Sequence, residues 1–146
     1  MVFDKSRSAG VLTGEIARLH AAELQRALVP LGLSRAQFVV LCELWLTDGM
    51  TQRELTDHLG LEQATMANTL ARMQRDGLIT RRPHPDDGRS QQIWLTGKAR
   101  ELEEPASRAA LEADSLVAAG LPSAERELFL SMLARVAANL RPGGTA

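Results

Sequence analysis

Apolar residues recur at helical spacing in the first third of the chain. They form two stripes ahead of Pro30 and Gly32, which end the predicted helix. One stripe runs through Leu12, Ile16, Leu19, Glu23 and Ala27, and the other runs through Leu24, Leu28 and Leu31. A helix with two such stripes has to be covered on more than one side. We therefore expect it to contact a second subunit as well as its own chain.

Two capping boxes predict the starts of the next helices. In Ser34–Gln37 and again in Thr51–Glu54, a hydroxyl residue is followed three positions later by Gln or Glu. In each box, the two residues can satisfy one another's free backbone N–H groups. The first box precedes the apolar run FVVLCELWL, which predicts a buried central helix ending near 48–49. The second precedes a short helix that stops at Gly60, and a further helix follows over 61–76.

Short apolar segments after Gly77 predict a β-hairpin. Residues 78–80 and 92–95 are expected to form its two strands, joined by the polar turn HPDDGRS. A hairpin that directly follows two short helices is typical of a winged helix-turn-helix. We predict that this unit runs from Thr51 to Thr96.

The last third of the chain again has a helical pattern. Thr96 can cap a long helix over about 97–119, in which Pro105 predicts a kink or an irregular turn. A final helix is expected after a break at residues 121–123, and its apolar positions are Leu128, Met132, Leu133, Val136 and Leu140. The fold class is thus mainly α (α+β), a winged helix-turn-helix with flanking dimerisation helices. We expect an N-terminal dimerisation helix over residues 1–33, a DNA-binding domain over 34–96 and C-terminal dimerisation helices over 97–146.

Composition supports a helical protein of the cytoplasm. Only 3% of the 146 residues are aromatic, and the apolar content comes largely from Leu and Ala, which favours helix–helix packing. The single cysteine, Cys42, rules out an internal disulfide and suits a reducing compartment. We see no signal peptide and no apolar run near the roughly 20 residues that span a bilayer, so no membrane association is expected.

The net charge of −1 does not by itself indicate nucleic-acid binding. The charge is unevenly distributed, however. Residues 51–100 hold eight Lys and Arg against six Asp and Glu, whereas residues 101–146 hold four against seven. The middle third is the basic part, but the excess is small. The argument for DNA therefore depends on the positions of the charges more than on their sum.

The helix over 61–76 is the predicted recognition helix. Its apolar positions Met66, Leu70 and Met73 face inward. The outer stripe and the first turn carry polar and small residues, namely Gln63, Ala64, Thr65, Asn68, Arg72 and Arg75. Asn and Gln can pair with adenine, Thr can contact thymine, and Arg can bind guanine or phosphate. Two members have an alternative interpretation: Arg75 as a solvated or ion-paired residue, and Arg72 as a support for the wing.

The turn between the two strands is the predicted wing. Arg89 is expected to enter a minor groove, because narrow and electronegative grooves attract arginine. Gly88 allows a tight turn, and Asp87 is expected to hold Arg89 or a loop amide. Ser90 beside Arg89, and Thr51 at an outward-facing helix start that can hold phosphate, complete the candidate DNA-contacting residues.

At these residues the chain resembles the MarR family of bacterial transcription regulators. The most specific element is D-G-R-S at Asp87–Ser90 followed by L-T at residues 95–96, and G-L-I-T-R-R at Gly77–Arg82 adds to it. The resemblance covers essentially the whole chain. It implies a homodimer that binds a pseudo-palindrome, often as a repressor released by a small ligand or by oxidation. It also implies that Arg89 is the minor-groove residue and that Thr65, Asn68 and Arg72 are recognition positions. Many members have a basic residue where this chain has Asn68, so its base preference is expected to differ.

Other functions are weighed against this one. If the winged helix served only for protein contacts, the polar stripe on the outside of the predicted recognition helix and Arg89 in the wing would be coincidental. Cys42 could be a redox sensor, but in VVLCELW it is better explained as a small residue of a buried helix. The scattered His20, His58 and His84 do not have metal-site spacing, so neither a metal nor a cofactor is expected. No catalytic motif is present, so we do not expect an enzyme.

A small effector is expected at the junction between the dimerisation helices and the winged region. A ligand there can change the spacing of two DNA-binding units, provided that it binds the two spacings with different affinity. Trp45, His20 and nearby leucines are the candidate lining residues. The sequence names neither the effector nor the operator.

Overall fold

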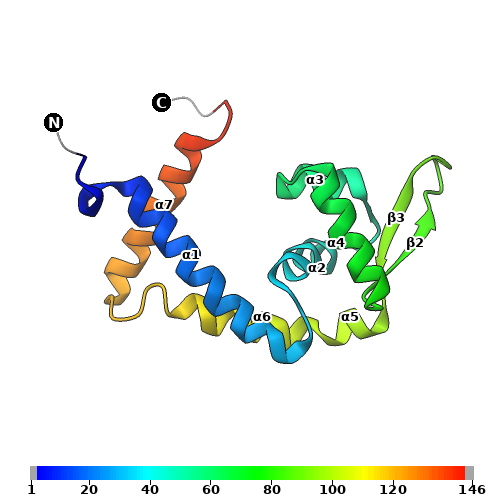
Figure 1. Cartoon of the computed structure of the whole chain (residues 1–146), viewed down its shortest axis with the longest axis horizontal. Coiled ribbons are helices and arrows are strands. Elements are labelled where there is room, and N and C mark those ends of the chain that lie inside the picture. The colour runs from blue at the N-terminus through cyan, green and yellow to red at the C-terminus, as the bar shows by residue number, and fades with distance from the viewer. Residues whose placement is uncertain (1–2, 144–146) are drawn as a thin grey trace.

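The computed structural model describes residues 3–143, so the outermost residues of the expected 1–33 and 97–146 segments lie outside the described residues. The helices form two groups (Figure 1). One holds α1, α6 and α7 near both chain ends, and the other holds the shorter helices and the sheet. The elements in order are α1 (Ala9–Leu28), α2 (Arg35–Leu46), β1 (Met50–Thr51), α3 (Gln52–Leu59), α4 (Gln63–Arg75), β2 (Ile79–Pro83), β3 (Gln91–Leu95), α5 (Gly97–Glu101), α6 (Glu103–Ser115) and α7 (Ser123–Leu140), with 3-10 turns at Lys5–Arg7 and Val29–Leu31.

Helix α1 has the two stripes that its sequence predicts, but its own chain covers only one of them. Leu24 and Leu28 are buried, and they belong to the core of the winged region. Leu12, Ile16 and Leu19 stay exposed towards the N-terminal end of the helix. One end of α1 is therefore anchored in the core, while the other leaves apolar side chains exposed.

The core surrounds α2, which is the central helix that the sequence predicts. Both predicted capping boxes form, at Ser34 with Gln37 and at Thr51 with Glu54. Helix α2 ends at Leu46, slightly before the expected 48–49. Its inward side packs with residues from most other elements to form one continuous cluster, whose largest fully buried members are Leu28, Val40, Leu41, Leu44, Leu55, Met66, Leu70, Met73, Leu78, Ile79 and Ile93.

The hairpin is longer than predicted and has a third strand beside it. Strands β2 and β3 are antiparallel, with Ile79 opposite Leu95 and Pro83 opposite Gln91, and the sheet order is β1-β3-β2. Strand β1 pairs with the side of β3 that faces away from β2, where Met50 lies opposite Ile93. Its two residues are too few to show an alternating pattern, which is why the sequence did not predict this strand.

The helical segment expected over about 97–119 is interrupted, as its proline predicts, but the break lies earlier than Pro105 and the helical segment ends earlier than 119. The chain forms α5 and α6 with a break at Leu102, and α6 ends at Ser115. Pro105 is the cause, because it lacks an N–H and its ring would clash with the carbonyl of residue 101 in a continuous helix. Within α6 it lies in the first turn, where the N–H groups lack intrahelical partners in any case.

Helix α7 follows the break that the sequence predicts and contains all the apolar positions expected for the last helix, and none of its residues is buried. It crosses α1 near the two chain ends (Figure 1). Leu128, Met132 and Val136 are all exposed along it. Within residues 3–143, no single helix is long and apolar enough to cross a membrane. Two consecutive segments, Ala9–Leu31 and Arg35–Leu46, reach that length and hydropathy only when they are taken together, and the chain bends by 78° between them.

Candidate nucleic-acid interface

Helices α3 and α4 form the predicted helix-turn-helix. Leu55 of α3 is fully buried, and so are Met66, Leu70 and Met73 of α4, which places one side of each helix against the core. Gly60 ends α3 with a φ of +61°, a left-handed conformation that glycine adopts without a steric cost. This tight turn lets α4 leave its opposite side open to solvent.

The residues predicted for recognition all lie on that open side. Gln63, Ala64, Thr65, Asn68 and Arg72 are exposed. Each residue of an α-helix is rotated by about 100° from the last, so positions 64, 68, 71 and 75 form the line directly opposite the buried side. Asn68 is near the middle of this line, and positions 65 and 72 lie on one flank of it.

The two alternative interpretations of the α4 arginines have different outcomes. Arg75 forms an ion pair with Asp76, with the Nε and Oδ1 atoms 3.3 Å apart, on an exposed surface. Arg72 forms no side-chain hydrogen bond or ion pair with any described residue, so no polar contact joins it to the wing. Gln74 takes that place instead, since its Oε1 atom accepts a hydrogen bond of 3.1 Å from Nε of Arg81.

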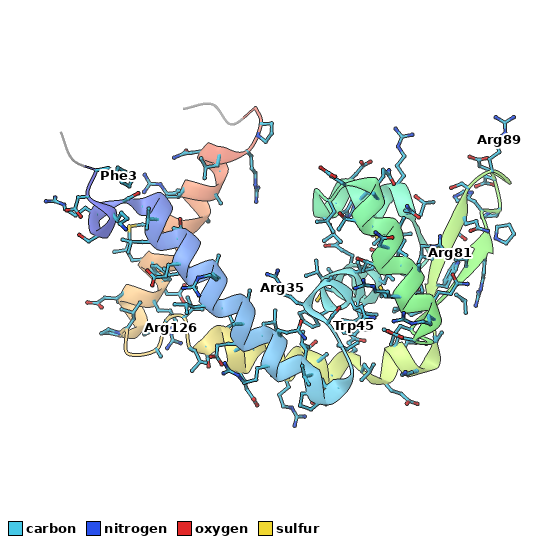
Figure 2. The ribbon with its side chains drawn as sticks, in the orientation of Figure 1. Phe3, Arg35, Trp45, Arg81, Arg89 and Arg126 are labelled. Carbon is cyan, nitrogen blue, oxygen red and sulfur yellow. The ribbon has the colours of Figure 1, made fainter. Side chains whose placement is uncertain are left out.

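The wing is a structured turn with an arginine at its tip. Asp87 accepts a hydrogen bond from the backbone N–H of Arg89 at 3.0 Å, so this carboxylate holds a loop amide. The Arg89 side chain projects away from the hairpin (Figure 2). The turn does not use the conformational freedom that Gly88 offers, because Gly88 does not have a positive φ and a Cβ there would meet nothing within 4 Å.

A groove of about 430 Å³ lies between the start of α3 and the wing. It brings together predicted residues from three elements with residues that sequence reasoning missed. The predicted ones are Thr51, Gln63, Gly88, Arg89 and Ser90, and the missed ones are Gln52, Arg53, Arg81 and Gln91. No acidic residue lines this groove. The charge of Arg53 and Arg81 made them candidates for DNA contact. Their position in this groove could not be predicted, because it depends on the pairing of β2 and on the orientation of α3.

Thr51 contributes to the groove through the start of α3. Its hydroxyl accepts a hydrogen bond from the Glu54 N–H at 3.2 Å and donates one to Glu54 Oε2 at 3.1 Å. The hydroxyl is therefore already used within the capping box. The pKa of the Glu54 carboxyl is lowered, mainly because this group accepts a hydrogen bond from the Thr51 backbone N–H.

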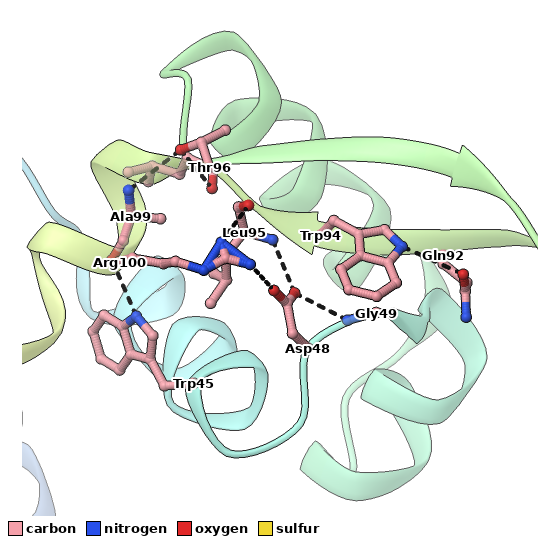
Figure 3. Close-up of polar contacts among 10 residues, drawn as sticks. Trp45, Asp48, Gly49, Gln92, Trp94, Leu95, Thr96, Ala99 and Arg100 are labelled. Carbon is pink, nitrogen blue, oxygen red and sulfur yellow. Dashed lines mark hydrogen bonds and ion pairs between the residues drawn. The ribbon is translucent and has the colours of Figure 1, made fainter.

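The wing is joined to the last helices by a polar junction (Figure 3). The Asp48 carboxylate accepts hydrogen bonds of 2.9 Å from the N–H groups of Gly49 and Leu95, and it forms an ion pair with Arg100. Arg100 also donates to the Leu95 carbonyl oxygen at 3.0 Å. This carboxylate therefore links α2, β3 and α5.

Thr96 and Trp45 complete the same junction. The Thr96 hydroxyl donates to the Gly77 carbonyl oxygen at 2.6 Å and accepts from the Ala99 N–H at 3.2 Å, which caps α5 as predicted. The Trp45 indole N–H donates to the Ala99 carbonyl oxygen at 3.0 Å. Helix α5 is thus hydrogen-bonded directly to α2, and its capping residue to the two residues that directly precede β2.

The expected effector lining is only partly brought together. A groove of about 470 Å³ lies between α1 and α6, lined by His20, Arg26 and apolar residues that include Leu19 and Leu116. Trp45 does not line it, because its ring packs edge-on against Phe38 and its N–H bonds to α5.

The candidate sensor residues lie apart from one another. Cys42 is half-buried, and burial raises the pKa of its thiol, whereas a reactive sensor thiol needs a lowered pKa. His20 faces Asp114, His58 faces Glu43, and His84 lies in the wing. Within residues 3–143 no group of three or more His, Cys, Asp or Glu side chains could hold a metal ion.

Comparison with known proteins agrees with this geometry. The profile of the MarR family matches residues 33–91. The HTH-type transcriptional repressor Rv2887 of Mycobacterium tuberculosis is 29% identical over 127 residues, which are 87% of this chain and 91% of the relative. A structure of BpsR from Bordetella bronchiseptica, whose DNA binding is regulated by 6-hydroxynicotinic acid, superposes with a TM-score of 0.84 at 26% identity, covering 94% of this chain and 98% of BpsR. A MarR regulator from Methanosarcina mazei gives 0.82 at 24% identity, covering 89% and 94%. The chain is therefore similar to MarR-family transcription regulators, both through the family match over residues 33–91 and through relatives that cover most of its length.

Proposed function

We propose that the protein is a sequence-specific DNA-binding repressor that acts as a homodimer on a pseudo-palindromic operator. The observation that carries the proposal is the surface formed by α4 and the wing. Base-reading side chains line the open side of α4, and the adjacent groove is lined by arginines without an acidic residue. Residues 34–96 would bind DNA, and residues 1–33 and 97–146 would form the dimer.

The proposed dimer follows from the apolar surface left on α1, α6 and α7. Helices in proteins owe most of their stability to tertiary packing of an apolar face, yet α7 buries none of its 18 residues. Leu12 and Ile16 of α1, Leu111 of α6, and Leu128 and Met132 of α7 are all exposed. A second copy would cover them, and the two α4 helices would then enter successive major grooves.

Within this proposal, Asn68 and its neighbours on α4 would contact base edges in the major groove. Arg89 would contact the minor groove beyond them, where the negative potential is highest in narrow segments. The repressor assignment is supported by the repressor names of curated relatives such as Rv2887. Reaching chromosomal DNA requires the cytoplasmic location that we expect from the sequence.

We also propose that a small ligand modulates DNA binding. The groove between α1 and α6 supports this proposal, because it combines apolar walls with the polar groups of His20 and of the Glu23–Arg26 ion pair. It lies beside the proposed dimer surface, where a bound ligand could change how far apart two winged domains are held. BpsR, which has this fold, is regulated by such a molecule.

Two measurements test the proposal. A mobility-shift titration uses DNA from upstream of the protein's own gene, and light scattering gives the mass of the protein with and without that DNA. We expect a dimer in both states and a shift at nanomolar to micromolar protein. The control is Arg89→Ala, which should weaken the shift. A chain that is monomeric and shifts no DNA would support the alternative, a winged helix used only for protein contacts.

A further inference from the structure

Three arginines from different elements line the groove between α3 and the wing. Arg53 belongs to α3, Arg81 to β2 and Arg89 to the wing tip. None of them forms an ion pair with a described residue, and the other lining residues are neutral. Like charges that share a groove repel one another, and an anion in the groove would relieve that repulsion.

Arg81 is the most constrained of the three. It lies opposite Ile93 in the sheet, so its side chain leaves β2 on the face that packs against the core, and it is half-buried. Its Nε atom donates to Oε1 of Gln74 on α4 at 3.1 Å. Figure 2 places it between α4 and the hairpin. Because glutamine is neutral, this contact fixes the direction of the guanidinium without cancelling its charge.

The opposite wall of the groove supplies neutral hydrogen-bonding groups. The Gln52 and Gln63 amides contact one another at 3.4 Å, which joins the first turn of α3 to the first turn of α4. Side-chain amide N–H groups and guanidinium N–H groups are both among the donors that proteins use to bind phosphate oxygens. The groove therefore pairs positive charge with oriented donors, which suits a phosphodiester better than a base edge.

From these contacts we propose that this groove is a phosphate-binding site for the DNA backbone, with Arg81 as its central cation and Gln74 as the residue that positions it. The proposal rests on the proposed function. A duplex that is held by α4 in the major groove and by Arg89 in the adjacent minor groove has to pass its backbone between them. Contacts to phosphate would fix the register of the protein on DNA and carry no sequence information themselves.

The test measures DNA affinity as a function of salt for Arg81→Gln and Arg53→Gln, by fluorescence anisotropy. Two duplexes of equal length are used, one enriched by the wild-type chain from random DNA and one with the same bases shuffled. Each lost phosphate contact should reduce the slope of log K against log salt by about 0.9 per protomer. We expect both variants to show this loss and to weaken both duplexes by the same factor.

The matched control is Arg82→Gln on the next residue of the same strand. Arg82 lies opposite Gln92 on the other face of the sheet, with its guanidinium 5.0 Å from the centroid of the Trp94 ring. Its slope should equal that of the wild type. Arg53 is exposed on α3, so Arg53→Gln keeps the test informative even if Arg81→Gln does not fold.

The outcomes separate this inference from the proposed function. Unchanged slopes in Arg81→Gln and Arg53→Gln, with DNA binding intact, would overturn the phosphate site alone. A loss confined to the enriched duplex would also overturn it, because Arg81 would then read a base. A wild-type chain that binds neither duplex would overturn the proposed function itself.

Discussion

Asn68 has the position on α4 that best suits a base contact. The residues one turn before and one turn after it on the outward line are Ala64 and Ala71, so small side chains flank the amide. None of its side-chain atoms is hydrogen-bonded within the described residues. A side-chain amide that is exposed and uncommitted can pair with both N6 and N7 of adenine in the major groove.

We predict that Asn68→Ala relaxes the preference at one base position in each half-site. The expected cost is about 1–3 kcal/mol for the preferred base and little for the other three. Competition binding with the four single-base variants of the operator measures this. If all four duplexes weaken equally, Asn68 supports α4 or contacts the backbone and does not read a base.

The contact between Asp76 and Gln37 predicts a pH dependence of stability. The amide of Gln37 donates to the Asp76 carboxylate at 2.8 Å, which joins α2 to the end of α4 and lowers the pKa of that carboxyl. A carboxyl whose pKa is lower in the folded state stabilises the protein above its unfolded pKa of about 4. That contribution is lost as the pH falls through the lower folded value.

We therefore expect the difference in unfolding free energy between wild type and Asp76→Asn to shrink as the pH falls from about 5 to about 2. Urea unfolding at a series of pH values measures it. The control is Asp57→Asn, because Asp57 is exposed and makes no side-chain hydrogen bond among the described residues. A difference for Asp76→Asn that stays constant with pH would refute this assignment.

Arg81 and Arg82 show what the sequence could not distinguish. They are neighbours with the same side chain, and either could have faced α4. The pairing of β2 with β3 decides it, because direct partners in an antiparallel pair share a face of the sheet. By contrast, the exposure of Asn68 could be predicted, since helical periodicity alone places it opposite Met66 and Leu70.

At the level of elements, the order and type of the helices and the hairpin follow from the sequence because caps and periodicity are local signals. Ser34, Thr51 and Thr96 each cap a helix as predicted. The split between α5 and α6 was placed at the wrong residue, since the clash caused by Pro105 acts one turn earlier. The polar junction around Asp48 could not be predicted, because it joins residues about 50 positions apart.

The close packing of Trp94 on Gly49 gives a prediction for the junction between α2 and the hairpin. Gly49 has a φ of +78°, and a Cβ on it would lie 2.6 Å from the indole ring. Gly60 has a similar φ of +61°, but a Cβ there would meet nothing within 4 Å. Gly60→Ala should cost only the backbone penalty of roughly 1–2 kcal/mol.

Gly49→Ala should cost more than Gly60→Ala, because it adds displacement of the Trp94 ring to the same backbone penalty. Urea unfolding of both variants followed by circular dichroism compares them. Equal losses in the two variants would show that the indole moves aside freely and that the junction is not closely packed.

At the level of the whole molecule, the proposed dimer accounts for the apolar residues that α1 and α7 leave exposed. The winged region has its own core, whereas α7 and the first half of α1 present apolar residues to solvent. Two such chains would bury these surfaces and hold the two α4 helices at a fixed separation. The junction around Asp48 and Thr96 would then carry that separation from the dimer helices to each wing.

We predict that Met132→Glu on α7 converts the dimer to a monomer, because it places a charge in the buried surface of the proposed interface. The matched control is Ser131→Glu, which lies on the polar side of the same helix and should leave the dimer intact. Light scattering over a dilution series gives the mass of each variant. Dimers of equal stability in both variants would place the interface elsewhere.

In the proposed dimer, two copies of this chain read two symmetric half-sites. Selection of bound sequences from random DNA by the wild-type chain tests it most directly. We expect an inverted repeat whose half-sites are centred about 10–10.5 base pairs apart, as two α4 helices on one face of the duplex require. Enrichment of a single unrepeated site or of a direct repeat, or the absence of any enrichment, would contradict the account.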